Sequence, residues 1–231
     1  MITANVFRRI FFVRYGNSTA TAFTIDENGL QYLITAKHVC PDIKDGDTLQ
    51  FYRGGSWHDW SVKVVGMGSG VDLGTDIAVL ALDHQVSPSF SMPATSANLV
   101  WGQEVFFLGY PYGLHTTLDV NNGYPLPLIK RALMSGSTEQ HGAPETFLLD
   151  GHNNTGFSGG PVVFRPFNQV NGDFCVMGVV SAYITENTSV TFQGKVTELV
   201  SPANTGIIIC PSIKQVVDMI SARPIGARIT E

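Results

Sequence analysis

The segment HNNTGFSGGPVVF, residues 152–164, contains one serine surrounded by glycines and followed at once by an apolar run. The glycines are Gly156, Gly159 and Gly160. Glycine weakens a strand because it loses much conformational entropy and packs nothing, so this cluster indicates a tight turn or a close backbone approach. Ser158 is therefore a candidate nucleophile, and a Gly-rich hairpin turn with an incidental hydroxyl is the alternative. A nucleophilic serine also requires a base and an orienting carboxylate.

The bulk composition limits the kind of protein this is. The chain has 231 residues, 44% of them hydrophobic and 14% charged, so it is long enough to bury a full core. Its formal net charge is −5 and its 14 Lys and Arg are mostly scattered, so we expect no nucleic-acid partner. The longest apolar runs, such as residues 77–82 and 206–210, have the length of strands, and we expect no membrane partner.

The cysteines and the N-terminus bear on the compartment. Cys40, Cys175 and Cys210 are widely spaced and odd in number, which fits neither a disulfide framework nor a paired metal site, so we expect reduced thiols. No metal or cofactor is expected. The first residues, MITANVFRRIFFVRYG, lack the apolar stretch of a signal peptide. We therefore expect a cytoplasmic protein, with a periplasmic or viral origin left open.

Hydrophobic patterning indicates the fold class. Short runs rich in Val, Ile, Phe and Tyr recur between turn clusters such as DENG, RGGS and NNGYP, which predicts an all-β barrel or sandwich. The expected strands include NVFRRIFFVRY near the start and FCVMGVVSAYI and TGIIIC near the end. The loop-like segment 84–99 divides the strands into two groups of about six. We therefore expect a first domain over residues 1–97 and a second over residues 98–231.

The C-terminal segment has a different periodicity. Residues 212–222 place four apolar side chains on one helical face, with Ser212 as the expected N-cap. The four are Ile213, Val216, Val217 and Ile220. This predicts one helix that closes an otherwise β structure.

Two other segments supply candidate partners for Ser158. In YLITAKHVC, His38 directly follows an apolar strand. In GTDIAVLAL, Asp76 begins a wholly apolar strand, where a carboxylate drawn toward the interior needs a hydrogen-bonding partner. Taken singly, His38 could be a structural histidine and Asp76 could simply cap its strand. Asp72 in the loop GSGVDLG competes with Asp76, but no apolar strand fixes its direction.

Taken in order, TAKHV, TDIAVL and GFSGGP resemble the trypsin/chymotrypsin-like serine peptidases, in which the triad residues also follow the order His, Asp, Ser. FLGYPYGL at 107–114 resembles the GxPxGL turn of the HtrA-type group, and Asp150 and Asn154 match the DxxxN that precedes its serine. GIIICPSIKQVV resembles that group's last strand and final helix. The resemblance covers nearly the whole chain.

The resemblance implies two six-stranded antiparallel β-barrels of the chymotrypsin-like fold with a C-terminal helix, and a serine endopeptidase that forms an acyl-enzyme. It implies that His38 is the general base, that Asp76 holds the imidazole tautomer and that Ser158 is the nucleophile. The amides of Gly156 and Ser158 would form the oxyanion hole. The implied substrate is a protein or peptide, and the oligomeric state stays open. A catalytically silent peptide-binding or scaffold module of this fold is the alternative.

Departures from the family narrow the expectation. Phe157 stands where secreted trypsins have the aspartate that pairs with a new N-terminus, which excludes that zymogen switch. Cys40 has no upstream partner cysteine. A viral-type cysteine peptidase would carry Cys at position 158. We also expect no PDZ domain after the helix.

The resemblance further implies a primary specificity pocket. His152, six residues before the serine, would lie at its floor, and Gly206 would face a wall formed by Ser181, Ala182 and Tyr183, which pairs with the substrate backbone. Histidine offers no fixed negative charge, so we expect small or apolar residues to be preferred over Lys or Arg. If His152 is protonated, an acidic residue would be preferred instead. A further alternative is that His152 points away from the pocket and only packs.

Overall fold

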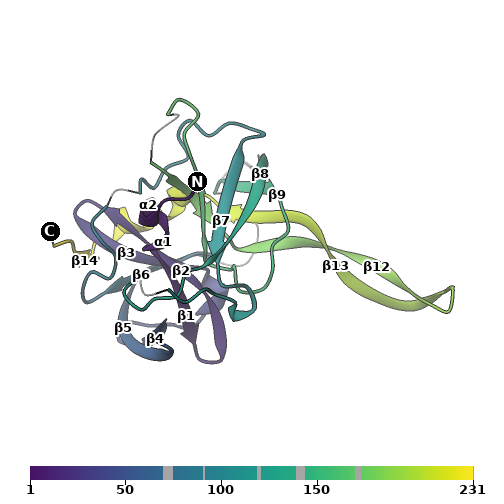
Figure 1. The fold of residues 1–231 in the computed structure, drawn as a ribbon, viewed down its shortest axis with the longest axis horizontal. Helices are drawn as coiled ribbons and strands as arrows, with labels where there is room; N and C mark the ends of the chain where they lie inside the picture. Colours follow the sequence, from purple (N-terminus) through teal and green to yellow (C-terminus); the bar gives the residue numbers. More distant parts are fainter. Residues whose placement is uncertain (70–74, 91, 119–120, 139–143, 170–172, 231) are drawn as a thin grey trace.

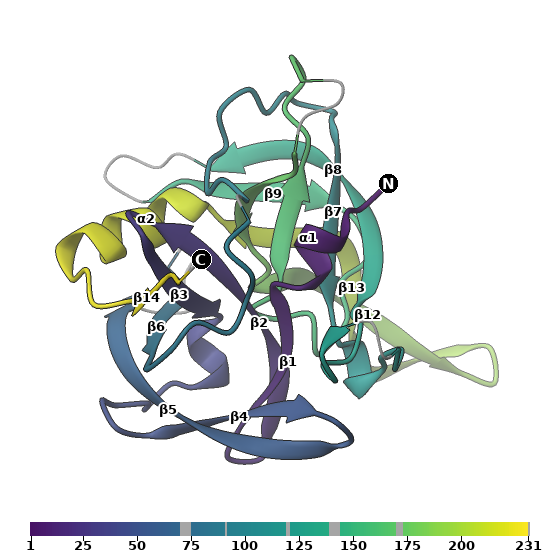
Figure 2. The same ribbon diagram turned by 60° about the vertical axis from the view of Figure 1, so that its left-hand side comes forward.

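The computed structural model describes residues 1–69, 75–90, 92–118, 121–138, 144–169 and 173–230. Two antiparallel sheets of seven strands each, drawn in Figures 1 and 2, form most of it. The predicted fold class, all-β with a C-terminal helix, is confirmed. The boundary between residues 1–97 and 98–231 stays a prediction.

The first sheet closes into a barrel. Its order is β14-β3-β2-β1-β4-β5-β6, and β6 also pairs with β3, so six strands form a ring to which β14 is added. Two-residue turns with positive φ at both positions join β2 to β3 (Asn28 and Gly29) and β4 to β5 (Gly54 and Gly55), a pattern that matches strand twist. The strands are β1 (Ile10–Tyr15), β2 (Ser18–Glu27), β3 (Leu30–Thr35), β4 (Thr48–Arg53), β5 (Ser56–Met67), β6 (Ala78–Leu82) and β14 (Ala227–Arg228).

The second sheet has the order β11-β10-β7-β8-β9-β13-β12. Six strands were expected here, and the structure has seven. Its two edge strands are joined by the chain, because only Val180 and Ser181 separate β11 from β12. The strands are β7 (Glu104–Gly109), β8 (Leu128–Thr138), β9 (Thr146–Asp150), β10 (Pro161–Phe164), β11 (Cys175–Val179), β12 (Ala182–Phe192) and β13 (Lys195–Pro211).

The helices include the predicted one. α2 (Ile213–Ala222) begins after Ser212, whose side chain accepts a hydrogen bond from the Lys214 amide. This confirms the expected helix and its N-cap. A short helix, α1 (Ala4–Phe7), stands where a continuous strand was expected, and β1 starts only at Ile10. Among the described residues, η1 (Lys37–Val39) and η2 (Pro111–Gly113) are short 3-10 helices.

The C-terminal segment returns to the first barrel. α2 packs against β5, and Figure 2 shows it beside β14 over the first sheet. Arg223, just after α2, donates to Asp45 at 2.9 Å. β14 then pairs with β3 at Leu30 and Gln31. The last residues therefore fasten the second half of the chain onto the first.

One buried ion pair joins the start of β1 to the end of β2. Arg9 is fully buried, and its guanidinium donates to both carboxylate oxygens of Asp26, at 3.0 and 2.5 Å. It also donates to the Pro88 carbonyl at 2.8 Å and to that of Phe90. Arg9 therefore holds the segment after β6 against the barrel, a role that its charge alone did not predict.

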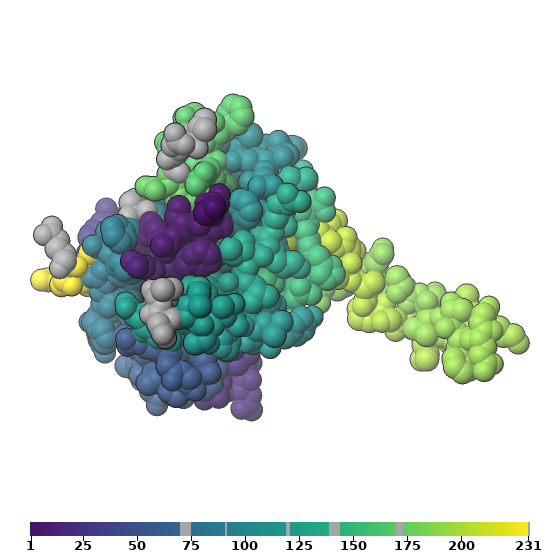
Figure 3. All heavy atoms as spheres, viewed as in Figure 1, coloured from purple at the N-terminus to yellow at the C-terminus, as the bar shows by residue number. Residues whose placement is uncertain are grey.

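The most prominent surface feature is a long hairpin. β12 and β13 continue past the body of the molecule as an arm, seen in Figures 1 and 3. Its tip is the turn Gln193–Gly194, again with positive φ at both residues. The sequence predicted only short strands at the base of this hairpin and missed the arm itself.

Candidate active site

His38 and Asp76 lie together at the edge of the first barrel. η1 carries His38, whose Nδ1 is 2.6 Å from Asp76 Oδ2 and whose backbone amide donates to Asp76 Oδ1 at 2.9 Å. The Asp76 side chain is 3% exposed and that of His38 39%. The carboxylate therefore fixes the ring from the interior and leaves its other edge toward solvent.

Asp76 is stabilised in its ionised form. Burial favours the neutral acid, but hydrogen bonds from His38 and from the Ser181 hydroxyl, at 2.6 Å, outweigh it and lower the pKa of Asp76. Ser181 is itself buried, at the junction between β11 and β12. A residue predicted for the pocket wall thus also supports the carboxylate.

The glycines around Ser158 are required by the packing of its loop. Gly156 has φ +104°, and a Cβ there would lie 2.3 Å from the Tyr110 carbonyl oxygen. Gly159 has φ +80°, and its Cβ would lie 2.2 Å from the carbonyl oxygen of Thr21. Neither position admits a side chain without displacing backbone. The glycines thus allow the close approach that the sequence indicated.

The carbonyls of this loop point into the protein. The Thr155 carbonyl accepts from the Tyr112 amide at 3.0 Å, and the Phe157 carbonyl accepts from the Gly160 amide at 2.8 Å. Because these peptides are trans, the N–H groups that follow, of Gly156 and Ser158, point the opposite way. Within the described residues, neither N–H donates to a protein acceptor. Two amide donors are thus free beside the serine side chain.

Thr21 on β2 fixes this loop from the first barrel. Its buried hydroxyl donates to the Gly156 carbonyl at 2.7 Å and accepts from the Tyr110 amide at 3.1 Å. Its backbone amide donates to the Ser158 carbonyl at 3.0 Å. One residue of the first sheet thus contacts the serine loop and the end of β7 together.

The Ser158 hydroxyl donates to the Ser181 carbonyl at 3.3 Å. Among the described residues it makes no hydrogen bond to the ring of His38. Hydrogen bonds between a nucleophile and its base often become short and well aligned only in the complex with substrate. His38 and Ser158 nevertheless line one pocket, of about 400 Å³.

That pocket combines predicted and unpredicted residues. Ser181, Ala182 and Tyr183, which the sequence assigned to a substrate pocket, line it. The two other predicted pocket residues, His152 and Gly206, are not among its lining. His152 is exposed, and its carbonyl accepts a hydrogen bond from Lys130.

Four further residues line the pocket: Asn153, Asn154, Thr155 and Thr185. Asn153 is 2% exposed, and its side-chain oxygen has no hydrogen-bond partner. Asn154 accepts from Lys130 at 3.0 Å and donates to the Tyr112 hydroxyl at 3.4 Å. The sequence placed His152 at the pocket floor, whereas the structure puts its neighbour Asn153 against the pocket. The only sequence signal for a role of Asn153 was its place in HNNTG, next to the predicted His152.

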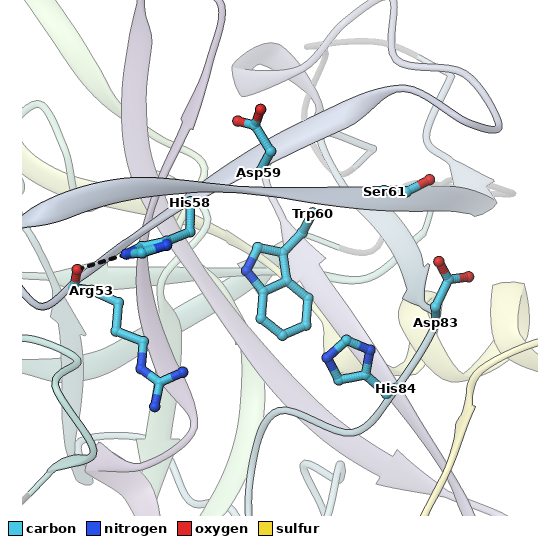
Figure 4. A pocket seen from close by; sticks show the side chains of 7 residues that line it. All are labelled: Arg53, His58, Asp59, Trp60, Ser61, Asp83 and His84. Carbon is cyan, nitrogen blue, oxygen red and sulfur yellow. Dashed lines mark hydrogen bonds between the residues drawn. The ribbon is translucent and has the colours of Figure 1, made fainter.

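A second pocket, of about 330 Å³, lies between β5 and the residues that follow β6 (Figure 4). His84 stacks on Trp60 at 4.5 Å, and His58 lies 3.1 Å from the Arg53 carbonyl. This pocket shares no residue with the one at Ser158. Asp72, the competitor of Asp76, lies outside the described residues.

The described part of the chain contains no cluster of three or more His, Cys, Asp or Glu arranged to hold a metal ion. No helix in it is both long and apolar enough to span a membrane.

The closed barrel, the second sheet and the pocket between His38 and Ser158 define a chymotrypsin-like peptidase fold. The family model for the trypsin-like peptidase domain matches residues 20–170, and the chain belongs to that family. It is thus a hydrolase of the peptidase class, whose substrates are proteins or peptides. No curated protein matches the chain in sequence.

Solved structures share the fold. The active form of the Rv3671c protease from M. tuberculosis matches with a TM-score of 0.61 and 17% identity over 98% of this chain and 88% of that one. AlgW, an HtrA-type protease solved with a tripeptide, matches with a TM-score of 0.58 and 18% identity over 95% of this chain. The match covers 61% of the AlgW chain.

Proposed function

We propose that the protein is a serine endopeptidase whose nucleophile is Ser158. Ser158 Oγ attacks the scissile carbonyl carbon while His38 Nε2 takes the hydroxyl proton. The C–N bond then breaks, and His38 gives that proton to the leaving amine. Water hydrolyses the resulting ester on Ser158 by the same two proton transfers.

The single observation that carries this proposal is the pairing of His38 with a buried, ionised Asp76 beside a pocket that also contains Ser158. A carboxylate at Nδ1 keeps the proton on that nitrogen and leaves Nε2 free to act as base. It also stabilises the imidazolium that forms during attack. In this role Asp76 positions the base and does not itself take the proton.

The free amides of Gly156 and Ser158 support an oxyanion hole. The tetrahedral intermediate carries negative charge on the former carbonyl oxygen, and preorganised N–H donors stabilise it by about 3–4 kcal/mol each. The amides of Tyr112 and Gly160 hold the carbonyls of the same two peptides, those of Thr155 and Phe157, on the opposite side. The donors therefore need no rearrangement before reaction.

The pocket supports a preference for small or uncharged side chains at the residue whose carbonyl is attacked. Tyr183 is bulky, and no carboxylate lines the pocket in the described residues. A Lys or Arg side chain would thus be buried without a counter-ion.

A fluorophosphonate probe tests the nucleophile. We expect labelling of Ser158 in the wild-type protein, identified by mass spectrometry of the peptide, and none in Ser158→Ala. The matched control is Ser135→Ala, which removes a hydroxyl from β8. Equal peptide cleavage by Ser158→Ala and wild type would contradict the proposal.

One observation favours a second candidate, the catalytically silent peptide-binding module. The Ser158 hydroxyl donates its hydrogen bond to the Ser181 carbonyl and would have to turn away from it to donate to His38. In that case the wild-type protein would bind peptides but neither react with the probe nor cleave any member of a peptide library. Labelling of Ser158 would exclude this candidate.

A further inference from the structure

The pocket at Ser158 opens onto an edge strand. Ala182, Tyr183 and Thr185 line the pocket and are also the first part of β12. β12 stands last in its sheet, and within the described residues it pairs only with β13. Its outer side thus carries unpaired backbone N–H and C=O groups that begin at the pocket and continue to Phe192.

Most of this strand belongs to the arm. β9 pairs with β13 only over 207–211, whereas the β12–β13 ladder extends to Phe192 and Lys195. Beyond Thr185 the arm therefore has two strands and no support from the body, as Figure 3 shows. Four of its large apolar side chains are 61–72% exposed, and a free ribbon of this kind is only marginally stable alone. The four are Phe192, Val196, Leu199 and Val200.

The two edges of the arm differ. On β13, Pro202 lies beyond the part covered by β9 and removes one N–H from that edge, and Lys195 adds a charge at the tip. Proline and lysine are devices that prevent strand addition at an exposed edge. β12, with the sequence AYITENTSVTF, contains neither. The edge of β12, which leads to the pocket, is thus the one that remains available for pairing with another strand.

The resemblance already implies that substrate pairs with the backbone at Ser181, Ala182 and Tyr183. We propose that the arm prolongs this pairing, so that the substrate continues as a further β-strand along the edge of β12 beyond Thr185. This rests on the proposed function of Ser158. The pocket walled by Ser181, Ala182 and Tyr183 receives the side chain of the residue whose carbonyl is attacked. The residues that precede it in the substrate therefore continue along β12.

The strand sets the kind of substrate. Eleven residues at about 3.3 Å each give an edge of about 36 Å, long enough to pair with a segment of similar length. β12 carries a single charged side chain, Glu186, so main-chain pairing contributes more than charge recognition. The preferred substrate is a long, extended segment of an unfolded polypeptide, and short peptides use only the pocket.

Peptides of graded length test the docking strand. One cleavable core is extended by about eight residues either before or after the scissile bond. We expect the N-terminal extension to raise kcat/KM by about tenfold or more, mainly through KM, and the C-terminal extension to change it by less than about threefold. Equal effects of the two extensions would overturn the proposal.

Backbone N-methylation tests strand pairing directly. Two long peptides carry N-methyl groups at alternate residues of the extension, in opposite phase. Successive N–H groups of a strand point to opposite sides, so only one of the two peptides is methylated on the N–H groups that face β12. That peptide should lose the increase in kcat/KM, and the other should keep it. The same result for both phases would show that main-chain pairing is not the cause.

A shortened arm tests the same idea on the protein side. Residues 189–200 are replaced by Asn-Gly, joining Thr188 to its ladder partner Ser201. Probe labelling of Ser158 and cleavage of the short core should be unchanged, while the gain from the N-terminal extension disappears. Retention of that gain, with a change from dimer to monomer in sedimentation, would make the arm a self-association surface and overturn the proposal.

These outcomes separate the inference from the function on which it rests. If Ser158 is not the nucleophile, neither the short core nor the probe reacts. If only the docking strand is wrong, both react normally and no length dependence appears. If the shortened protein does not fold, the N-methylated peptides still test the docking strand, because they are assayed with the full-length protein.

Discussion

Replacing Thr21 by Val tests whether one hydroxyl of the first barrel holds the serine loop. The two side chains have nearly the same shape, so the change removes two buried hydrogen bonds, to the Gly156 carbonyl and from the Tyr110 amide. Each buried group left without a partner costs about 1–3 kcal/mol, so the free energy of unfolding should fall by about 2–6 kcal/mol. At about 3 kcal/mol, Tm would fall by about 6–12 °C.

The stability assay is denaturant unfolding in the Ser158→Ala background, which prevents self-cleavage. Thr19→Val is the matched control, because Thr19 lies exposed on the same strand, and its effect should stay within about 0.5 kcal/mol. With Ser158 intact, Thr21→Val should also slow probe labelling by about tenfold or more, since the loop that carries the Gly156 and Ser158 amides loses a hydrogen bond to the first barrel. A loss of stability no greater than that of the control, with normal labelling, would refute the reasoning.

Four other predictions concern single groups. Arg9→Met should lower the free energy of unfolding by about 3–5 kcal/mol, and adding Asp26→Leu should restore part of it, as measured by urea unfolding. Asn153→Asp places a carboxylate at the pocket and should raise the preference for Lys or Arg before the scissile bond by about tenfold or more in a peptide-library profile. The pKa of Asp76 is lowered, so its ionised form stabilises the fold above the ordinary Asp pKa of about 3.9, and this stabilisation is lost as pH falls through the lowered pKa. Acid should therefore destabilise Asp76→Asn less than wild type in urea unfolding followed as pH is lowered. Burial raises the pKa of the Cys40 thiol to about 12 and also raises those of the other two, so a thiol reagent at about pH 8 should find all three cysteines only after denaturation.

The sequence predicted what local patterns encode. Apolar alternation between turn clusters placed most strands, and the face containing Ile213 and Val216 placed α2 behind its N-cap Ser212. The glycines around Ser158 indicated a close backbone approach, and the structure supplies the atoms they approach. The roles of His38, Asp76 and Ser158 stay predictions.

What the sequence missed depends on non-local contacts or on weak local signals. The arm escaped because its strands are rich in Thr and Ser and its turn is Gln193–Gly194, where Asn-Gly is the common signal. Thr21 escaped because its partners lie 89 and 135 residues away. No role was predicted for Arg9, since nothing near it in sequence shows that Asp26 and two carbonyls enclose it.

The return of the C-terminal segment makes the two halves dependent on each other. A cut within residues 84–99 would leave an N-terminal fragment whose strand β3 lacks β14 and whose strand β5 lacks the helix that packs on it. The C-terminal fragment would in turn lack Thr21, which anchors the loop around Ser158. Each piece would thus lack contacts that stabilise it in the intact chain. The molecule is thus suited to fragment complementation, in which mixing the two inactive pieces restores the enzyme at a rate set by their encounter.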